Sequence, residues 1–78
     1  MIEDKIIGYV IKITREKMKL SQEVVSGFAD IGRAHLSAIE CGTRIPTMHT
    51  FFKIAEALGM APSELMKKME IESEANKK

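Results

Sequence analysis

The sequence has few of the residues that build disulfides, aromatic cores or thiolate metal sites. Of its 78 residues one is cysteine, none is tryptophan and 5% are aromatic. The single thiol, Cys41, excludes an internal disulfide and a zinc site made of several thiolates. Such sparse cysteine usage is typical of a reducing compartment, so we expect a cytoplasmic protein with a core of aliphatic and methionine side chains.

Long apolar stretches are also absent. No run of about 18 apolar residues occurs and charges are spread through the N-terminal part, which argues against a membrane span and a signal peptide. No paired carboxylates, nucleophile–base set or cofactor loop is present, so we expect neither an enzyme nor a cofactor. His35 and His49 have no cysteine or carboxylate cluster that would complete a metal site.

The charge balance gives no general attraction to nucleic acid. The formal net charge is +1 at pH 7. A protein of this charge that binds a polyanion must depend on local geometry and not on a basic field.

Apolar residues recur at the spacing of helices, and no alternating strand pattern occurs. We predict an all-α fold, a compact five-helix bundle, with Ser21 and Thr47 as N-caps and with Gly42 and Gly59 after helix ends. The predicted helices are 5–18, Gln22 to about Ala29, Arg33 to Cys41, Met48 to about Leu58, and about 61–70. The apolar face of the first is expected to contain Ile7, Ile11, Thr14 and Met18. Residues 1–70 would form one domain, followed by a polar tail at 71–78.

The segment from Arg33 to Cys41 has two contrasting faces. On a helical wheel Leu36, Ile39 and Glu40 lie together and should face the core. The opposite face is made of small or polar side chains: Ala34, Ser37, Ala38 and Cys41, flanked by Arg33 and His35. A helix with small outward side chains and an arginine in its first turn fits a DNA major groove about 12 Å wide. With the preceding helix and a short turn it would form a helix-turn-helix unit.

The stretch "REKMKLSQEVVSGFADIGRAHLSAIECGTRIPTMHTFFKIAEALGM", Arg15 to Met60, resembles the Cro-like, or lambda-repressor-like, XRE-type helix-turn-helix regulators of bacteria and phages. The resemblance covers roughly residues 6–66. It implies a set of DNA-contacting residues: Gln22, Gly32, Arg33, Ala34, His35, Ser37, Ala38 and Arg44. Within this set Arg33, Ala34 and Ala38 match base-reading positions. His35 fits a base contact and a plain surface histidine equally well.

The resemblance also implies a structural ion pair and shows two departures. Arg15 and Glu40 match a partly buried pair that joins the first helix to the recognition helix. Asp30 stands where the family usually has a glycine, and its tolerance of left-handed backbone should preserve the turn. Val24 and Phe28 occupy positions that are usually charged. They either pack under the fourth helix or form an exposed apolar patch.

The C-terminal helix carries more apolar side chains than so small a domain is expected to bury within itself. We predict that these residues form a dimer interface: Met60, Leu65, Met66 and Met69. A two-fold dimer would set two recognition helices about 34 Å apart, which suits a palindromic operator on double-stranded DNA.

Two functions follow as hypotheses. The first is a homodimeric, sequence-specific transcriptional regulator of the phage-repressor or restriction–modification controller type, which blocks or recruits RNA polymerase. The second is an antitoxin-like or other protein-interaction module, which holds a toxin or another partner. The weak net charge and the Val24/Phe28 pair favour the second, and the outward face of the 33–41 helix favours the first.

Overall fold

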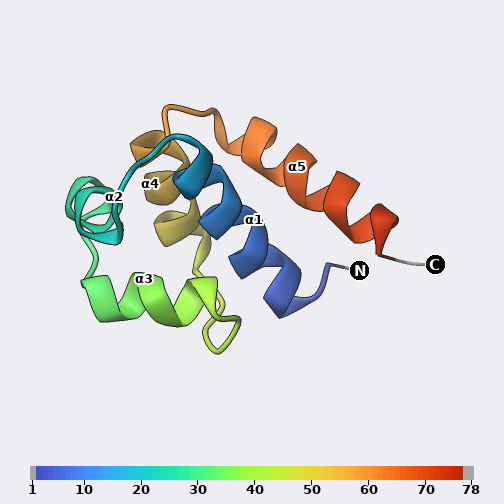
Figure 1. Cartoon of the computed structure of the whole chain (residues 1–78), viewed down its shortest axis with the longest axis horizontal. Coiled ribbons are helices and arrows are strands. Elements are labelled where there is room, and N and C mark those ends of the chain that lie inside the picture. The colour runs from blue at the N-terminus through green and yellow to red at the C-terminus, as the bar shows by residue number, and fades with distance from the viewer. Residues whose placement is uncertain (1, 77–78) are drawn as a thin grey trace.

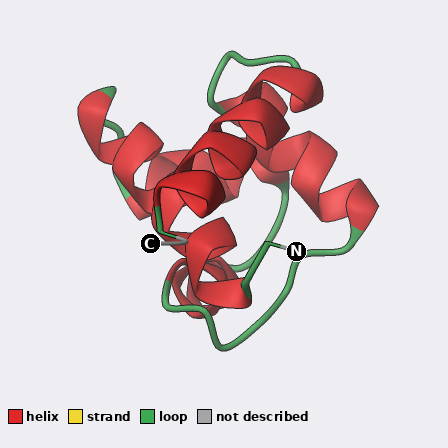
Figure 2. Cartoon of the chain, turned by 90° about the vertical axis from the view of Figure 1, so that its right-hand side faces the viewer, coloured by secondary structure: helices red, strands yellow, loops and turns green. Residues whose placement is uncertain are grey.

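The computed structural model describes residues 2–76, which form five α-helices joined by short loops (Figures 1 and 2). The helices are α1 (Asp4–Lys17), α2 (Gln22–Ala29), α3 (Arg33–Glu40), α4 (Met48–Ala57) and α5 (Pro62–Ala75). α1 packs against both α3 and α5, while α2 packs against α3 and α4. The prediction of an all-α, five-helix architecture is confirmed.

Several helix ends lie where capping residues occur in the sequence. The Ser21 hydroxyl accepts a hydrogen bond from the Val24 amide at 3.1 Å and thereby caps α2. The Thr47 hydroxyl accepts one from the Thr50 amide, also at 3.1 Å, at the start of α4. Each bond satisfies one of the amides that a helix leaves unpaired in its first turn.

Among residues 2–76, two residues other than glycine adopt left-handed backbone. Asp30 has a φ of 56° and ends α2, and Lys19 has a φ of 59° in the loop that follows α1. The Asp30 conformation agrees with the turn that the sequence predicted. A left-handed residue with a Cβ costs roughly 1–2 kcal/mol, so both positions carry backbone strain.

The core is aliphatic and lies where the five helices meet. Phe51, Ile54, Ala55 and Leu58 form the buried face of α4, as the sequence predicted. The remaining buried apolar residues are Ile6, Val10, Ile11, Val25, Ala29, Leu36, Ile39, Leu65 and Met69. The prediction for α1 was partly wrong, because Met18 follows the end of the helix and is 44% exposed.

The C-terminal helix differs from its prediction in two ways. α5 continues to Ala75, beyond the predicted end near residue 70, because the segment from Ile71 to Ala75 contains no glycine or proline that would stop it. Lys77 and Lys78 of the predicted tail lie outside the described residues. Leu65 and Met69 are 0% and 1% exposed in the core of their own protomer, so they offer no surface to a second copy.

The described helices are short and amphipathic. Within residues 2–76 no helix is both long and apolar enough to cross a membrane.

Candidate nucleic-acid interface

α2 and α3 form a helix-turn-helix unit at one side of the molecule. A three-residue turn joins them, and the Ile31 amide donates a hydrogen bond to the Ser26 carbonyl at 3.0 Å to close α2. The two helices pack against each other, and α3 lies along the lower edge of the bundle in Figure 1, below α1, which it also contacts. This position leaves one side of α3 free of protein.

The two faces of α3 are those predicted from the sequence. Leu36 and Ile39 are fully buried, and Glu40 is 7% exposed. Arg33, Ala34 and Cys41 are exposed, whereas His35, Ser37 and Ala38 are half-buried. Small side chains on the outer face allow a close approach of a partner to the α3 backbone.

A network of hydrogen bonds fixes α3 to the rest of the bundle. Arg15 Nε donates to Glu40 Oε2 at 2.7 Å, and Arg15 Nη2 donates to Glu40 Oε1 at 3.1 Å. The other Arg15 amino group donates to the Leu20 carbonyl at 2.8 Å. Thus one guanidinium holds α1, the loop before α2 and the end of α3 together, and the ion pair implied by the resemblance is present.

Gln22, the first residue of α2, completes this network. Its Nε2 donates to Glu40 Oε1 at 2.9 Å. The side chain that Gln22 braces is therefore Glu40 at the end of α3, and not one of the outward residues. The first amides of α2 remain available to an anion, which a helix N-terminus favours.

The pKa of Arg15 is raised above its ordinary value. The hydrogen bond to Glu40 is the main cause, burial acts in the opposite direction, and the charges of Glu40 and Glu16 add to the increase. The guanidinium therefore stays protonated at neutral pH, and it is a permanent cation within the bundle.

The loop after α3 folds back onto that helix. The amides of Thr43 and Arg44 donate to the Ala38 carbonyl at 3.0 and 3.3 Å, and the Thr43 hydroxyl donates to the same carbonyl at 3.0 Å. Because the Arg44 amide is used in this way, a phosphate contact by Arg44 must come from its exposed guanidinium. The sequence analysis did not predict this role of Thr43. The only indication in the sequence was the position of the threonine directly after Gly42, the glycine that ends the helix.

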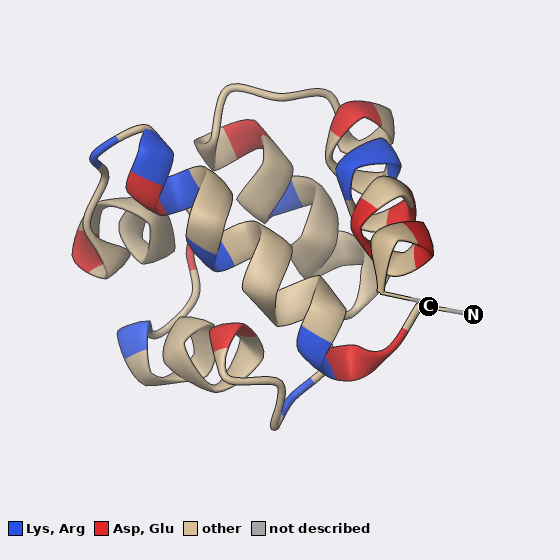
Figure 3. Ribbon diagram, turned by 45° about the vertical axis from the view of Figure 1, so that its right-hand side comes forward, with Lys and Arg blue, Asp and Glu red and all other residues tan. Residues whose placement is uncertain are grey.

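Hydrogen-bonding side chains lie at both ends of α3. Arg33 lies at its start, and Gln22 and Arg44 lie near its end, about 12 Å away for a helix of eight residues. Neither Arg33 nor Arg44 forms an ion pair with another described residue. Figure 3 shows a basic residue at the start of α3 and an acidic one at its end, while in α5 the lysines lie between an acidic residue near its start and several acidic residues toward its end.

The close packing of α1 on α3 depends on a glycine that the sequence reasoning did not interpret. A Cβ at Gly8 would overlap the main-chain carbonyl oxygen of Ile39 and would lie 2.7 Å from that of Glu40. Only a residue without a side chain lets α1 approach the last turn of α3 this closely. The signal in the sequence was a glycine inside an otherwise good helix.

No metal site overlaps this surface in the part of the chain that the structure describes. Among residues 2–76 no three His, Cys, Asp or Glu side chains are grouped so that they could hold a metal ion. The arrangement presents hydrogen-bond donors and small side chains on a convex helix, which is the chemistry of DNA recognition.

Comparisons with known proteins point the same way. A helix-turn-helix family model matches residues 11–65, which include the whole candidate interface. Control protein C.MunI of Mycoplasma sp is 38% identical over 61 residues, which are 78% of this chain and 82% of that protein. Control protein C.BamHI of Bacillus amyloliquefaciens is 36% identical over 55 residues, with coverages of 70% and 68%. The crystal structure of the restriction-modification controller protein C.AhdI from Aeromonas hydrophila has a TM-score of 0.75 and 28% identity, covering 78% of this chain and 92% of that one.

Proposed function

Since the chain belongs to the helix-turn-helix family of DNA-binding transcriptional regulators, we propose that it binds an inverted-repeat operator as a homodimer and controls transcription from a nearby promoter. The observation that carries the proposal is the outer face of α3, which combines small side chains with the exposed Arg33. Its similarity to control proteins supports a controller role, in which occupancy of the operator blocks or recruits RNA polymerase.

Base recognition in this proposal depends on the first turns of α3. Arg33 can donate two hydrogen bonds to the O6 and N7 acceptors of one guanine. His35 lies on the flank of the same face and can donate to a base or a phosphate. Ala34 and Ala38 have only methyl groups to offer, which suits contact with the methyl group of thymine.

Phosphate contacts would set the register of α3 in the groove. Gln22 Oε1 is an acceptor, so the free amides at the start of α2 are the groups that would hold one phosphate. Arg44 would hold another with its guanidinium. Gly32 and Ser37 have no bulky side chain. In this arrangement they would allow the sugar–phosphate backbones of both DNA strands to come close to α3.

The proposal is tested by selecting bound sequences from a random duplex pool at about 0.15 M salt, because salt screens non-specific binding. We expect an inverted repeat whose half-sites are about ten base pairs apart. Recovery of no motif would contradict sequence-specific recognition.

Two arginine variants then separate base reading from backbone contact. Arg33→Ala should weaken binding to the selected operator by about 1–3 kcal/mol and relax the base preference at one position of the operator. Arg44→Ala should weaken binding to selected and unrelated DNA by the same factor and reduce the salt dependence of the DNA affinity. Equal weakening of all DNA by Arg33→Ala would assign Arg33 to phosphate contact.

The dimer requires a surface other than the buried side of α5. Three exposed apolar side chains, which we call the 45–66 patch, line a pocket between the loop after α3, the start of α4 and the side of α5: Ile45, Met48 and Met66. Ile45 and Met48 are 57% and 64% exposed. We assign this patch to the second copy, since its side chains are apolar and exposed in the single protomer. Met60 is half-buried and lies outside it.

A second candidate function rests on α2. Val24 and Phe28 are 43% and 78% exposed, so the pair forms an apolar patch and does not pack under α4. A partner protein, such as RNA polymerase or a toxin, could cover it. Replacement of Phe28 by Ser should abolish such a complex and leave operator binding intact, while Arg33→Ala should do the reverse. Loss of DNA binding with Phe28→Ser would remove this second candidate.

A further inference from the structure

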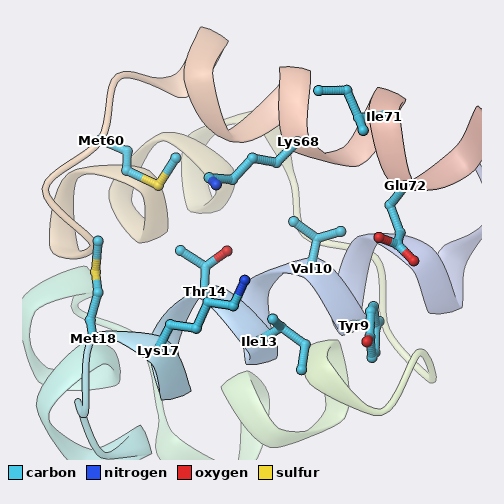
Figure 4. A pocket seen from close by; sticks show the side chains of 10 residues that line it. All are labelled: Tyr9, Val10, Ile13, Thr14, Lys17, Met18, Met60, Lys68, Ile71 and Glu72. Atoms are coloured by element: carbon cyan, nitrogen blue, oxygen red, sulfur yellow. The ribbon is translucent and has the colours of Figure 1, made fainter. Parts of the chain in front are cut away.

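A groove runs between α1 and α5, away from the helix-turn-helix unit. It has a volume of about 410 Å³, within the range of small-molecule sites. Its described lining residues come from α1, α5 and the residues that follow α1 and α4, and none comes from α2, α3 or α4 (Figure 4). DNA bound to α3 would therefore leave the groove open.

The walls of the groove are mainly apolar. Val10 forms part of the floor, Tyr9 and Ile13 lie beside it on α1, and Ile71 lies on the rim of α5. Tyr9 is 47% exposed and Ile71 is 59% exposed. These side chains form a strip on which a hydrocarbon chain could bury apolar surface. Between Tyr9 and Thr14 the strip is about 8 Å long, at 1.5 Å per helical residue.

Two lysines lie toward the end of the groove that Met18 and Met60 also line (Figure 4). Figure 4 shows Lys17 from α1 and Lys68 from α5 directed into the space between the two helices. Neither lysine forms an ion pair with another described residue. Two ammonium groups that face one space repel each other, and an anion between them would remove this repulsion.

The hydroxyl group of Thr14 points into the same space. Thr14 is 8% exposed, and its hydroxyl forms no hydrogen bond with any other described residue. Since no buried side-chain oxygen or nitrogen among residues 2–76 lacks a hydrogen-bond partner, the Thr14 oxygen is accessible from the groove and free to bind a ligand there. Thr14 therefore adds a third donor, at the floor of the groove, to the two lysines.

The opposite end of the groove carries the opposite charge. The Glu72 carboxylate lies there near Tyr9, and it accepts a hydrogen bond from Asn76 Nδ2 at 3.1 Å. A negatively charged head group would be repelled at this end. The charges thus define one orientation, with the head group at Thr14 and the apolar part directed toward Tyr9 and Ile71.

We propose that the α1–α5 groove binds an anionic amphiphile, that is, a carboxylate with a short hydrocarbon chain. The ammonium groups of Lys17 and Lys68 and the hydroxyl of Thr14 hold the carboxylate. The chain lies on Val10, Ile13 and Tyr9. Occupancy joins α1 to α5 and stabilises the folded chain by mass action.

The test uses octanoate as the probe and the full chain without DNA, so that its result is independent of the operator. Amide resonances of residues 9–18 and 68–72 should shift in a saturable way, and those of α3 should not. Acetate, which has no chain, should cause no shift. Octyltrimethylammonium has the same chain and the opposite charge, so it should bind at least about tenfold more weakly.

Variants show whether the head group lies where the proposal places it. Lys68→Gln and Lys17→Gln should each weaken the binding of octanoate by about threefold to fivefold, because each removes one exposed ion pair with the carboxylate. Thr14→Val keeps the shape of the side chain and should also weaken it. Lys67→Gln is the matched control, because Lys67 is exposed on α5 and does not line the groove, and it should have no effect.

Three results would overturn the proposal. They are the absence of saturable shifts, equal binding of octanoate and octyltrimethylammonium, and equal losses in Lys67→Gln and Lys68→Gln. Another occupant, a second copy of the chain, is tested by Ile71→Asp. If that variant turns a dimer into a monomer, the groove is a protein interface and the amphiphile site is excluded.

Discussion

At the scale of single residues, the buried charges among the described residues are Arg15 and Glu40, which form one ion pair. Glu40 accepts hydrogen bonds from Arg15 and Gln22, and Arg15 also donates to the Leu20 carbonyl. Each of the two buried charges is hydrogen-bonded, and no buried side-chain nitrogen or oxygen among residues 2–76 lacks a partner, which compensates for the loss of water around the pair. Removal of either one leaves the other buried and unpaired.

We therefore expect Arg15→Ala to lower the free energy of unfolding by about 3 kcal/mol or more. Gln22→Ala removes one hydrogen bond and should cost about 1–2 kcal/mol. Urea unfolding followed by circular dichroism measures both, with Lys12→Ala on the exposed side of α1 as the control. A loss below 1 kcal/mol for Arg15→Ala, in the range of surface pairs, would show that the pair is solvated.

The pH dependence of this contribution follows from the raised pKa of Arg15. The folded-state pKa lies above the unfolded one, so the stabilisation is complete at every pH below the unfolded value. It is lost only as the pH rises through the folded value. The stability difference between the wild type and Arg15→Ala should hence stay constant from about pH 6 to 9. Unfolding midpoints measured across this range check it.

The strained residue Lys19 gives a prediction of opposite sign. Its φ of 59° suits glycine, so Lys19→Gly should raise the free energy of unfolding by about 0.5–1 kcal/mol. The same substitution within α1, Lys12→Gly, should lower it by about 1 kcal/mol. Thermal unfolding of the two variants tests the difference, and two losses of equal size would show that Lys19 is not strained.

At the scale of helices, the position of α3 depends on the missing side chain of Gly8. α1 lies directly on the last two carbonyl groups of α3, and these belong to the main chain and cannot move away singly. Gly27, in α2, is also helical, but a Cβ there would meet no atom within 4 Å. The two glycines therefore differ in packing and not in secondary structure.

We expect Gly8→Ala to lower the free energy of unfolding by about 1–3 kcal/mol, as overpacking does, although alanine favours a helix. Gly27→Ala should raise it by up to about 1 kcal/mol. Urea unfolding gives both values. Stabilisation by Gly8→Ala would mean that α1 and α3 separate easily, and operator binding by that variant would then show whether α3 keeps its position.

At the scale of the whole molecule, the two apolar sides of α5 have separate roles in our proposals. Met66 lies on the side of the 45–66 patch, and Ile71 lies on the rim of the α1–α5 groove. The buried residues between them hold the helix to the protomer core. A charge placed on one side should therefore affect one function and not the other.

Met66→Asp should convert the proposed dimer to a monomer in sedimentation experiments, because it places a charge in an apolar interface. Operator affinity should fall at the same time, since a monomer contacts one half-site. Ile71→Asp should leave both unchanged. A monomeric wild type at high micromolar concentration would contradict the dimer itself.

Much of the fold followed from local patterns. Ser21 and Thr47 mark the helix starts because their hydroxyls satisfy amides a few residues away, and this contact does not depend on the tertiary structure. The inward face of α3 was predicted since helical periodicity alone brings Leu36, Ile39 and Glu40 together. The Arg15–Glu40 pair is different, because it links residues far apart in the sequence, and only the family resemblance indicated it.

The wrong prediction for α5 and the alternatives left open for Phe28 have a common physical cause. The sequence indicates which residues share a helix face, but it does not indicate which element that face will meet. Leu65 and Met69 were predicted at a dimer interface, and they are buried against their own protomer because α5 packs on α1 and α4. Phe28 had two possible environments, and the packing of α2 on α4 leaves it exposed.

The sequence by itself thus determined the all-α architecture, the helix starts and the two faces of α3, which depend on interactions a few residues long. The tertiary structure decided the rest: the contact at Gly8, the use of Gln22 by Glu40, and the groove in which Thr14 meets Lys17 and Lys68. These features bring together groups from different helices. Their geometry is set by the relative placement of the helices, and no local pattern in the sequence specifies it.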